Sequence, residues 1–249
     1  MKNQQDNKIV EYLNRVRRAS VEDIAKEIYC SPSTVRRRLS SLSTQGIINR
    51  THGGASINDT NTFVYDFSYR IDVNGGAKKR IALAAAKLIN DGDVIYLDAS
   101  TSAWHIIPYL VERKNVKVMT NGIDTMQMLS KYNIDAYSTG GKIDSVDKAV
   151  LVGSVAERTI KSMYYDICFF SSQSLSEDGI ISDPSQEGNE ITIVAKSSSK
   201  KTVFLCDKEK FGRTSTFKCL SVSELDLIIT DEDLENKLKV DRLPQIICV

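Results

Sequence analysis

Seven short apolar runs, separated by stretches suited to helices, fill the sequence from residue 77 to residue 249. The intervening helical stretches are residues 78–90, 101–113, 123–132 and 150–163. Near-continuous apolar strands that alternate with helices are typical of a mainly parallel sheet covered on both faces. We therefore expect an α/β domain whose strands are residues 94–98, 116–120, 134–138, 167–171, 202–206, 227–230 and 246–249.

Polar and glycine residues follow four of these predicted strands. In parallel sheets, ligands bind beyond the carboxyl ends of the strands, where loops offer backbone N–H groups and side chains. One such loop is common in any α/β domain, but hydroxyl, glycine or lysine residues at four strand ends together favour a phosphate or carboxylate ligand. The candidate ligand-binding residues are Asp98, Ser100, Thr101, Ser102, Asn121, Gly140, Gly141, Lys142, Asp207 and Lys210.

The first 56 residues predict three helices. Apolar residues at helical spacing between Ile9 and Val16 indicate the first. Ser20 is placed as the N-cap of a second helix over residues 21–29, with Asp23 in the capping-box position. Ser31 and Pro32 then supply a cap residue and a proline for the start of a third helix.

The third helix carries the chemistry of this segment. At about 100° per residue, Val35, Leu39 and Leu42 share one face and Ser33, Arg37 and Ser41 lie opposite, with Arg36 and Arg38 beside them. A helix with a narrow apolar face and three arginines can enter the major groove of DNA, where arginine binds guanine edges or phosphates. The alternative is a solvated basic face, which the preceding helix and tight turn make less favourable.

A small β-hairpin wing is expected after this helix. Gly46 ends the helix, Ile47 and Ile48 begin a strand, and a Gly53-Gly54 turn follows. Arg50 and His52 would lie beside the DNA backbone, although His52 could equally be a turn residue without a contact. The candidate DNA-binding residues are Ser31, Ser33, Thr34, Arg36, Arg37, Arg38, Arg50 and His52.

The charge is uneven along the chain. The net charge is only +1, but residues 1–56 contain ten Lys or Arg and five Asp or Glu, which leaves −4 for the remainder. A basic segment on a mildly acidic body suits one that meets phosphates. The polar N-terminal residues and the lack of a long apolar run predict a cytoplasmic protein without a membrane partner.

Five scattered cysteines and two histidines predict reduced core thiols and neither a structural metal nor a cofactor.

Three parts are expected: a winged helix-turn-helix domain at residues 1–57, a linker at 58–75 and the α/β domain at 76–249. Aromatic residues at a spacing of two suggest that the linker is extended, namely Phe63, Tyr65, Phe67 and Tyr69.

The N-terminal segment resembles the DNA-binding domain of the DeoR family of bacterial sugar-metabolism regulators. The matching positions are residues 20–25 (SVEDIA), 31–37 (SPSTVRR), Leu39, Leu42, Gly46 and residues 50–55 (RTHGGA). The family typically has Asp where this chain has Arg38, so we expect Arg38→Asp to change the operator preference or the salt dependence of binding.

The α/β segment resembles the sensor domain of the same family, which is related in fold to ribose-5-phosphate isomerase and glucosamine-6-phosphate deaminase. The matching positions are Ile81, Ala82, residues 91–93 (DGD), Leu97, Asp98, Thr101, Thr120, Asn121, Gly140, Gly141, Gly153, Asp166, Phe169, Gly179, Asp183, Asp207, Lys210, Phe211 and residues 229–231 (ITD). The resemblance implies a phosphorylated sugar or related metabolite as effector.

Three positions depart from the family's sensor pattern. Ser100 and Ser174 stand where glycine is usual, and Ser102 stands at the second position of a Thr pair. A side chain at a position that needs positive φ costs about 1 kcal/mol. We therefore expect reshaped loops and either an unusual effector or weaker binding of phosphate.

Three functions are weighed on these observations. The first is a repressor, working as a homo-oligomer (dimer or tetramer) on double-stranded operator DNA, whose affinity is controlled by a phosphorylated sugar. The second is an isomerase-like enzyme in which Lys210 acts with Asp207 or Asp98 in proton transfer. The third is a DNA-binding protein whose second domain only oligomerises. The basic recognition helix favours the first.

Overall fold

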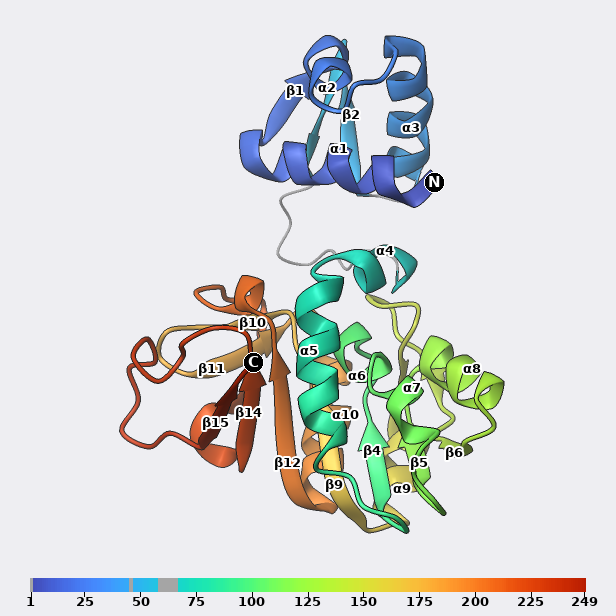
Figure 1. Ribbon diagram of the computed structural model, residues 1–249, viewed down its shortest axis with the longest axis vertical. Helices are drawn as coiled ribbons and strands as arrows, with labels where there is room; N and C mark the ends of the chain where they lie inside the picture. The colour runs from blue at the N-terminus through green and yellow to red at the C-terminus, as the bar shows by residue number, and fades with distance from the viewer. Residues whose placement is uncertain (1, 45–46, 58–66) are drawn as a thin grey trace. The chain divides into compact units, whose positions relative to one another are not determined.

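A computed structural model describes residues 2–44, 47–57 and 67–249 of the chain (Figure 1). The chain divides into two compact units, Met1–Val73 and Asn74–Val249. Gly46, Phe63 and Tyr65 lie outside the described residues, so the expectations for them are untested. Each unit is described by itself below.

The first unit contains the three expected helices and a small antiparallel sheet of order β1-β3-β2. Ser20 caps the second helix as expected, because its Oγ accepts a hydrogen bond from Asp23 N over 3.1 Å. The elements are α1 (Lys2–Val16), β1 (Arg18–Ser20), α2 (Val21–Glu27), α3 (Pro32–Thr44), β2 (Ile48–Thr51), β3 (Gly54–Ile57) and α4 (Phe67–Asp72).

Two elements of this unit differ from the sequence prediction. Strand β1 was not expected; it pairs with β3 through its backbone, and three residues are too few to show a period. Residues 67–72, expected to be extended, form the helix α4. Phe67 is buried in it, and the guanidinium of Arg70 lies 5.4 Å from the centre of its ring, a contact that helical spacing permits.

Apolar side chains of α1, α2, α3 and the wing form one core in the first unit. Its largest members are fully excluded from solvent, and burying each such side chain stabilises the fold by roughly 1.5–3 kcal/mol. They are Ile9, Leu13, Ile24, Leu39, Leu42, Ile47 and Ile48.

The second unit is built on a seven-stranded sheet of order β15-β14-β12-β9-β4-β5-β6, and every neighbouring pair is parallel. All seven strands predicted from the apolar runs are found in it, so the predicted α/β fold class is confirmed. They are β4 (Val94–Leu97), β5 (Lys117–Thr120), β6 (Asp135–Ser138), β9 (Tyr165–Phe170), β12 (Ser199–Cys206), β14 (Leu227–Thr230) and β15 (Gln245–Cys248).

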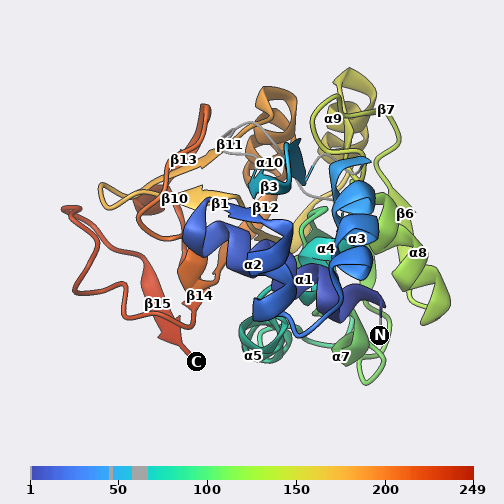
Figure 2. The same ribbon diagram turned by 90° about the horizontal axis from the view of Figure 1, so that it is seen from above.

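Helices cover both faces of this sheet (Figures 1 and 2). One face packs on α5 (Gly75–Ala86), α6 (Thr101–Trp104), α7 (Ile107–Leu110) and α8 (Ile123–Lys131). On the other face, residues of α9 (Ser154–Lys161) and α10 (Gln186–Ser197) pack against Tyr96, Met119, Tyr165 and Cys168. Strand side chains that alternate in direction supply both cores, as in other doubly covered sheets.

The predicted helix at residues 101–113 is instead two short helices, α6 and α7. Pro108 lies in the first turn of α7 and has no N–H with which to continue the hydrogen-bond ladder of a preceding helix. The helix α10 and two small antiparallel sheets were not predicted. One sheet contains β10 (Ser174–Leu175), β11 (Ile180–Asp183) and β13 (Phe217–Ser221). The other pairs β7 (Lys142–Ile143) with β8 (Leu151–Val152), so the helix predicted from residue 150 begins only at Ser154.

Among the described residues, no helix combines the length and the apolar character needed to cross a bilayer.

Candidate functional site

The recognition helix α3 separates an apolar face from an exposed face. Val35 and Leu39 are fully buried, whereas Ser33 and Arg37 are exposed on the opposite side. Within the part of the chain that the structure describes, the Arg37 side chain has no ion pair or hydrogen bond. Its guanidinium is therefore available to guanine edges or to phosphates.

Arg36 lies at one border of this exposed face. Its Nη2 is 3.5 Å from Oε1 of Glu22 on α2, and both side chains are more than half exposed. The backbone oxygen of Arg36 accepts a hydrogen bond from Nη1 of Arg50 over 3.3 Å. Arg50 thus links the wing to α3, and both guanidinium groups can still reach a phosphate, because exposed contacts of this kind are weak.

Arg38 lies at the opposite border and turns toward α1 rather than toward solvent. Its Nη1 is 2.8 Å from Oδ1 of Asp6, and only 12% of the Arg38 side chain is exposed. The three arginines therefore differ in their surroundings. The structure separates Arg38 from the exposed face that carries Arg37.

The other predicted DNA-binding residues lie at the start of α3 and in the wing. Ser31 Oγ accepts a hydrogen bond from Thr34 N over 3.2 Å and lies 2.9 Å from Ser33 Oγ and Thr34 Oγ1, so this serine caps α3. His52 is exposed in the turn between β2 and β3, where Gly53 has a φ of +78°.

Asp98 is the centre of the predicted effector site, at the carboxyl end of β4. It is 8% exposed and accepts hydrogen bonds from Ser171 N (2.9 Å), Ser100 N (3.0 Å) and Ser100 Oγ (2.5 Å). Burial raises the pKa of Asp98 to about 6, against the opposing effects of these hydrogen bonds and of Lys210. Asp98 is therefore a buried acceptor held in a fixed orientation.

The loop after β4 accommodates Ser100 without backbone strain. Ser100 has a φ of −78° and caps α6, with Oγ accepting from Ala103 N over 3.1 Å. Ser174 in β10 is also absent from the residues with positive φ. Neither serine occupies a conformation that requires glycine, so neither side chain strains the backbone; that these loops differ in shape from those of the family stays a prediction. Thr101 and Ser102 are buried on α6.

Lys210 and Asp207 lie on the loop after β12. Lys210 Nζ donates to the backbone oxygen of Ser172 and is 3.9 Å from Oδ2 of Asp207, which is 3% exposed. Asn74 Nδ2 donates to the other carboxylate oxygen, Oδ1, over 3.0 Å. This loop therefore brings one ammonium group and one carboxylate together beside the loop after β9.

Asn121 is buried at the end of β5 and has structural partners. Its Oδ1 accepts from Tyr96 OH over 2.9 Å, and its Nδ2 donates to the Leu151 oxygen over 3.4 Å. Burial raises the pKa of Tyr96 well above its usual value, so the phenol remains a donor. Asn121 thus joins β4 to the strand β8 (Leu151–Val152).

Gly140, Gly141 and Lys142 form a group of their own around the start of α9. Gly140 and Gly141 have φ values of +61° and +104°. Lys142 Nζ is 2.8 Å from Oε1 of Glu187, and that hydrogen bond raises the pKa of Lys142. An open hollow is lined by Gly141, Lys142, Val152, Gly153, Ser154, Val155 and Glu187.

The structure therefore connects Asp98, Ser100, Asp207 and Lys210 through hydrogen bonds and charge, and it leaves Lys142 on a separate ion pair. Sequence reasoning missed the loop after β9, which contacts Asp98 and Lys210, and the contact of Asn74. The serine pair Ser171-Ser172, at the end of the strand predicted for residues 167–171, was an available signal. The Asn74 contact spans 133 positions and left none.

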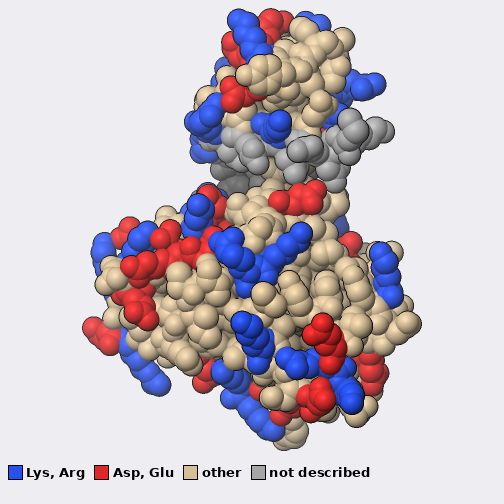
Figure 3. Space-filling view, in the orientation of Figure 1, with Lys and Arg blue, Asp and Glu red and all other residues tan. Residues whose placement is uncertain are grey.

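Charge on the second unit is mixed, and Figure 3 shows basic and acidic side chains interspersed over its visible face.

Four of the five cysteines are at least partly buried and Cys248 is exposed. Burial raises the pKa of the Cys219 thiol to about 12, so it is not a nucleophile at neutral pH. Among the described residues, no group of three His, Cys, Asp or Glu could hold a metal ion.

Solved structures with similar folds have low sequence identity to the chain. Ribose 5-phosphate isomerase A of Methanocaldococcus jannaschii is 18% identical with a TM-score of 0.43, over 55% of each chain. The delta subunit of eIF2B from Chaetomium thermophilum is 17% identical with a TM-score of 0.47, over 65% of this chain and 58% of that chain.

Two family profiles match the chain, the DeoR-like helix-turn-helix domain at residues 6–61 and the DeoR C-terminal sensor domain at residues 73–232. The transcriptional repressor GlcR of Bacillus subtilis is 31% identical over 94% of this chain and 90% of its own length. The L-fucose operon activator of Haemophilus influenzae is 29% identical over 95% of each chain. The chain belongs to the DeoR family of transcriptional regulators and combines its DNA-binding and sensor domains.

Proposed function

We propose that the protein is a cytoplasmic repressor that binds double-stranded operator DNA and changes its operator affinity when a phosphorylated sugar or related metabolite binds the second unit. The observation that carries this proposal is a buried acceptor, Asp98, within the electrostatic influence of the Lys210 ammonium, which itself lies 3.9 Å from Asp207, at the carboxyl edge of the sheet. The proposed parts are residues 1–57, a linker at 58–75 and a sensor at 76–249 that also forms a homo-oligomer, a dimer or tetramer.

The DNA contacts are assigned by exposure. Arg37 and Ser33 face outward from α3 and are proposed to read base edges, while Arg36 and Arg50 at its border bind phosphates. Such modules bind half-sites about one helical turn apart, or multiples of it, which requires at least a dimer. Ser31 and Thr34 fix the start of the helix.

The effector contacts follow from charge and hydrogen-bonding capacity. Lys210 supplies a cation for a phosphate, and Asp98 supplies an acceptor for a sugar hydroxyl in a site with little water. Both groups contact the backbone of the loop after β9: Ser171 N donates to Asp98, and the Ser172 oxygen accepts from Lys210. A ligand that satisfies both charges at once is a phosphorylated polyol or sugar.

DNA binding is tested on duplexes from the protein's own promoter, with fluorescence anisotropy at low and at moderate salt. We expect binding that weakens steeply with salt, as phosphate contacts require. Reporter expression from the same promoter should rise when the regulator is deleted. A protein that ignores every duplex at low ionic strength contradicts the proposal, and expression that falls on deletion indicates an activator.

Effector binding is tested by isothermal titration with glucose 6-phosphate, fructose 1-phosphate, ribose 5-phosphate and their unphosphorylated sugars. Lys210→Met should abolish the heat, and Lys208→Met is the matched control, because Lys208 is exposed on the same short helical turn, η1 (Lys208–Lys210). Uniformly absent heat with every sugar phosphate contradicts the sensor proposal. Turnover of ribose 5-phosphate would instead identify an isomerase.

A further inference from the structure

Asn74 is the first residue of the second unit, and its backbone is in a left-handed conformation. Its φ and ψ are 55° and 27°, and it occupies the N-cap position of α5 without making a side-chain cap bond. Among residues other than glycine, asparagine tolerates this conformation best. The φ and ψ of Asn74 therefore set the direction of the backbone immediately before α5.

The side chain of Asn74 is directed to the proposed effector site instead of to its own helix. Nδ2 donates to Oδ1 of Asp207 over 3.0 Å, while Lys210 Nζ lies 3.9 Å from Oδ2 of the same carboxylate. Asp207 is almost fully buried, so water competes little for either oxygen. One carboxylate is therefore shared between the proposed phosphate-binding cation and the first residue of the second unit.

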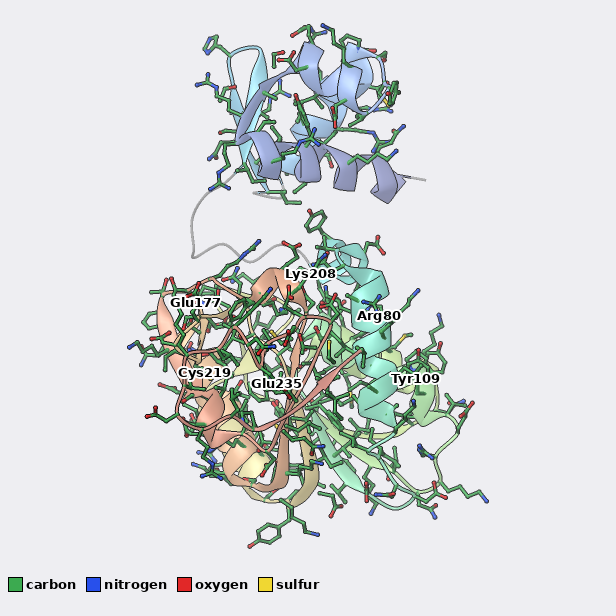
Figure 4. All side chains as sticks on the ribbon, turned by 60° about the vertical axis from the view of Figure 1, so that its left-hand side comes forward. Arg80, Tyr109, Glu177, Lys208, Cys219 and Glu235 are labelled. Carbon is green, nitrogen blue, oxygen red and sulfur yellow. The ribbon has the colours of Figure 1, made fainter. Side chains whose placement is uncertain are left out.

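A second carboxylate fastens α5 to the same loop. Arg80 Nη2 is 3.5 Å from Oδ2 of Asp231, and the backbone nitrogen of Lys208 donates to Oδ1 of Asp231 over 2.8 Å. Arg80 lies on α5 and Lys208 on the loop after β12, as Figure 4 shows. Arg80 thus connects the middle of α5 to this loop through Asp231, and Asn74 connects the start of α5 to the same loop through Asp207.

We propose that Asn74 is a positioning residue that holds the Asp207–Lys210 loop and transmits occupancy of the effector site to the linker. The proposal rests on the function proposed above. A phosphate that attracts the ammonium of Lys210 weakens the ion pair between Lys210 and Asp207. The negative charge on the Asp207 carboxylate that accepts the hydrogen bond from Asn74 then changes. The strength of the Asn74 bond then differs between the free and bound states, which is the differential interaction that coupling requires.

The test uses the full chain with Asn74→Asp, because aspartate keeps the size and the tolerance for positive φ but replaces the donor by a carboxylate that repels Asp207. The matched control is Asn133→Asp, since Asn133 also has a positive φ of 53° and lies exposed after α8. Asn74→Gly separates the amide from the backbone conformation, because glycine adopts positive φ freely.

Two measurements are made on each variant. The first is hydrogen exchange at the amides of Lys208, Lys210 and Phe211, which report on the loop without any ligand. The second is the ratio of operator affinities with and without a sugar phosphate that binds the wild-type chain, taken from the panel above. Titration of that sugar phosphate into each variant records whether binding itself survives.

We expect exchange of the loop amides to be about tenfold faster in Asn74→Asp and Asn74→Gly and unchanged in Asn133→Asp. The ratio of operator affinities, typically about 5- to 150-fold in coupled systems, should fall to about one while the sugar phosphate still binds. Unchanged exchange overturns the positioning role, and a preserved ratio overturns the transmission role. If no sugar phosphate binds the wild type, the proposed function fails, and the exchange data still decide the role of Asn74.

Discussion

Arg38 Nη1 donates a hydrogen bond to Asp6 Oδ1 over 2.8 Å and thereby joins the recognition helix α3 to α1 across a partly buried contact. The side chains are 12% and 22% exposed, so solvent screens the attraction between these charges less than it screens the exposed contact between Arg36 and Glu22. We interpret Arg38 as a residue that sets the position of α3, with Arg37 as its reading residue.

Arg38→Ala should lower the stability of the first unit by about 1–3 kcal/mol, because it removes a hydrogen bond between charged groups and leaves Asp6 without it. Hydrogen exchange of the α1 and α3 amides measures this loss. The charge-swapped pair Asp6→Arg with Arg38→Asp should recover most of it. If each single variant is as stable as the wild type, the contact has no structural role.

Arg37→Ala should weaken operator binding by about 1–3 kcal/mol and relax the preference for one base pair. The reason is the exposure of Arg37 on α3 and its lack of a partner among the described residues. Fluorescence anisotropy on the operator and on single-base variants measures both effects. Arg15→Ala is the control, because Arg15 is also exposed but is paired with Glu27 at 2.7 Å; equal losses in the two variants would refute the assignment.

Asp98 should make the second unit more stable as the pH falls. Its pKa is raised by burial from 3.8 to about 6, so the folded state binds a proton more readily than the unfolded state. The cost of the buried charge is present above pH 6 and is relieved between about pH 6 and pH 4. At about 1.4 kcal/mol per unit, the shift corresponds to about 3 kcal/mol.

Urea unfolding followed through Trp104, which belongs to this unit, measures the effect for the wild type and for Asp98→Asn. The difference in unfolding free energy between the two should shift in favour of the wild type as the pH is lowered. Asp135→Asn replaces an exposed carboxylate on β6 and serves as the control. A difference for Asp98→Asn that stays constant with pH contradicts the prediction.

Gly141→Ala should destabilise the second unit by about 1–3 kcal/mol or more. Gly141 has a φ of +104°, and a Cβ there would lie 2.5 Å from the backbone oxygen of Val152. Gly76→Ala is the matched control: this helical glycine has open space around it, and alanine should stabilise α5 by roughly 0.5–1 kcal/mol. Thermal unfolding compares the stabilities of the two variants. Similar effects would show that the short distance between a Cβ at residue 141 and the Val152 oxygen does not destabilise the fold.

The strands of the large sheet were predictable because each is a short apolar run buried on two faces. Leu227, Ile228 and Ile229, for example, are fully buried in β14. The small sheet was not predictable, because β10 has two residues and β13 carries the exposed residues Phe217 and Lys218, so neither shows a clear period. Their pairing depends on contacts with the core formed around Phe170 and Phe204.

The candidate sites were predictable as positions on loops and helix faces but not as contacts. Angular spacing placed Arg37 opposite the apolar face of α3, and the exposure pattern agrees. The same spacing left Arg38 beside that face, and only the folded position of Asp6, 32 residues earlier, decides where its guanidinium lies. Asn74 and Asp207 lie farther apart still, so their contact depends on the whole sheet.

The three central strands are tied to one another immediately beyond their last residues. The backbone N–H of Ser171 donates to Asp98 Oδ2, and its hydroxyl donates to the Leu205 oxygen over 2.6 Å, so Ser171 joins segments that lie 73 and 34 positions away in the sequence. These contacts are made by the first loop residues after β4 and β9. Changes elsewhere in those loops that keep Asp98 and Ser171 should therefore leave the three strand ends joined.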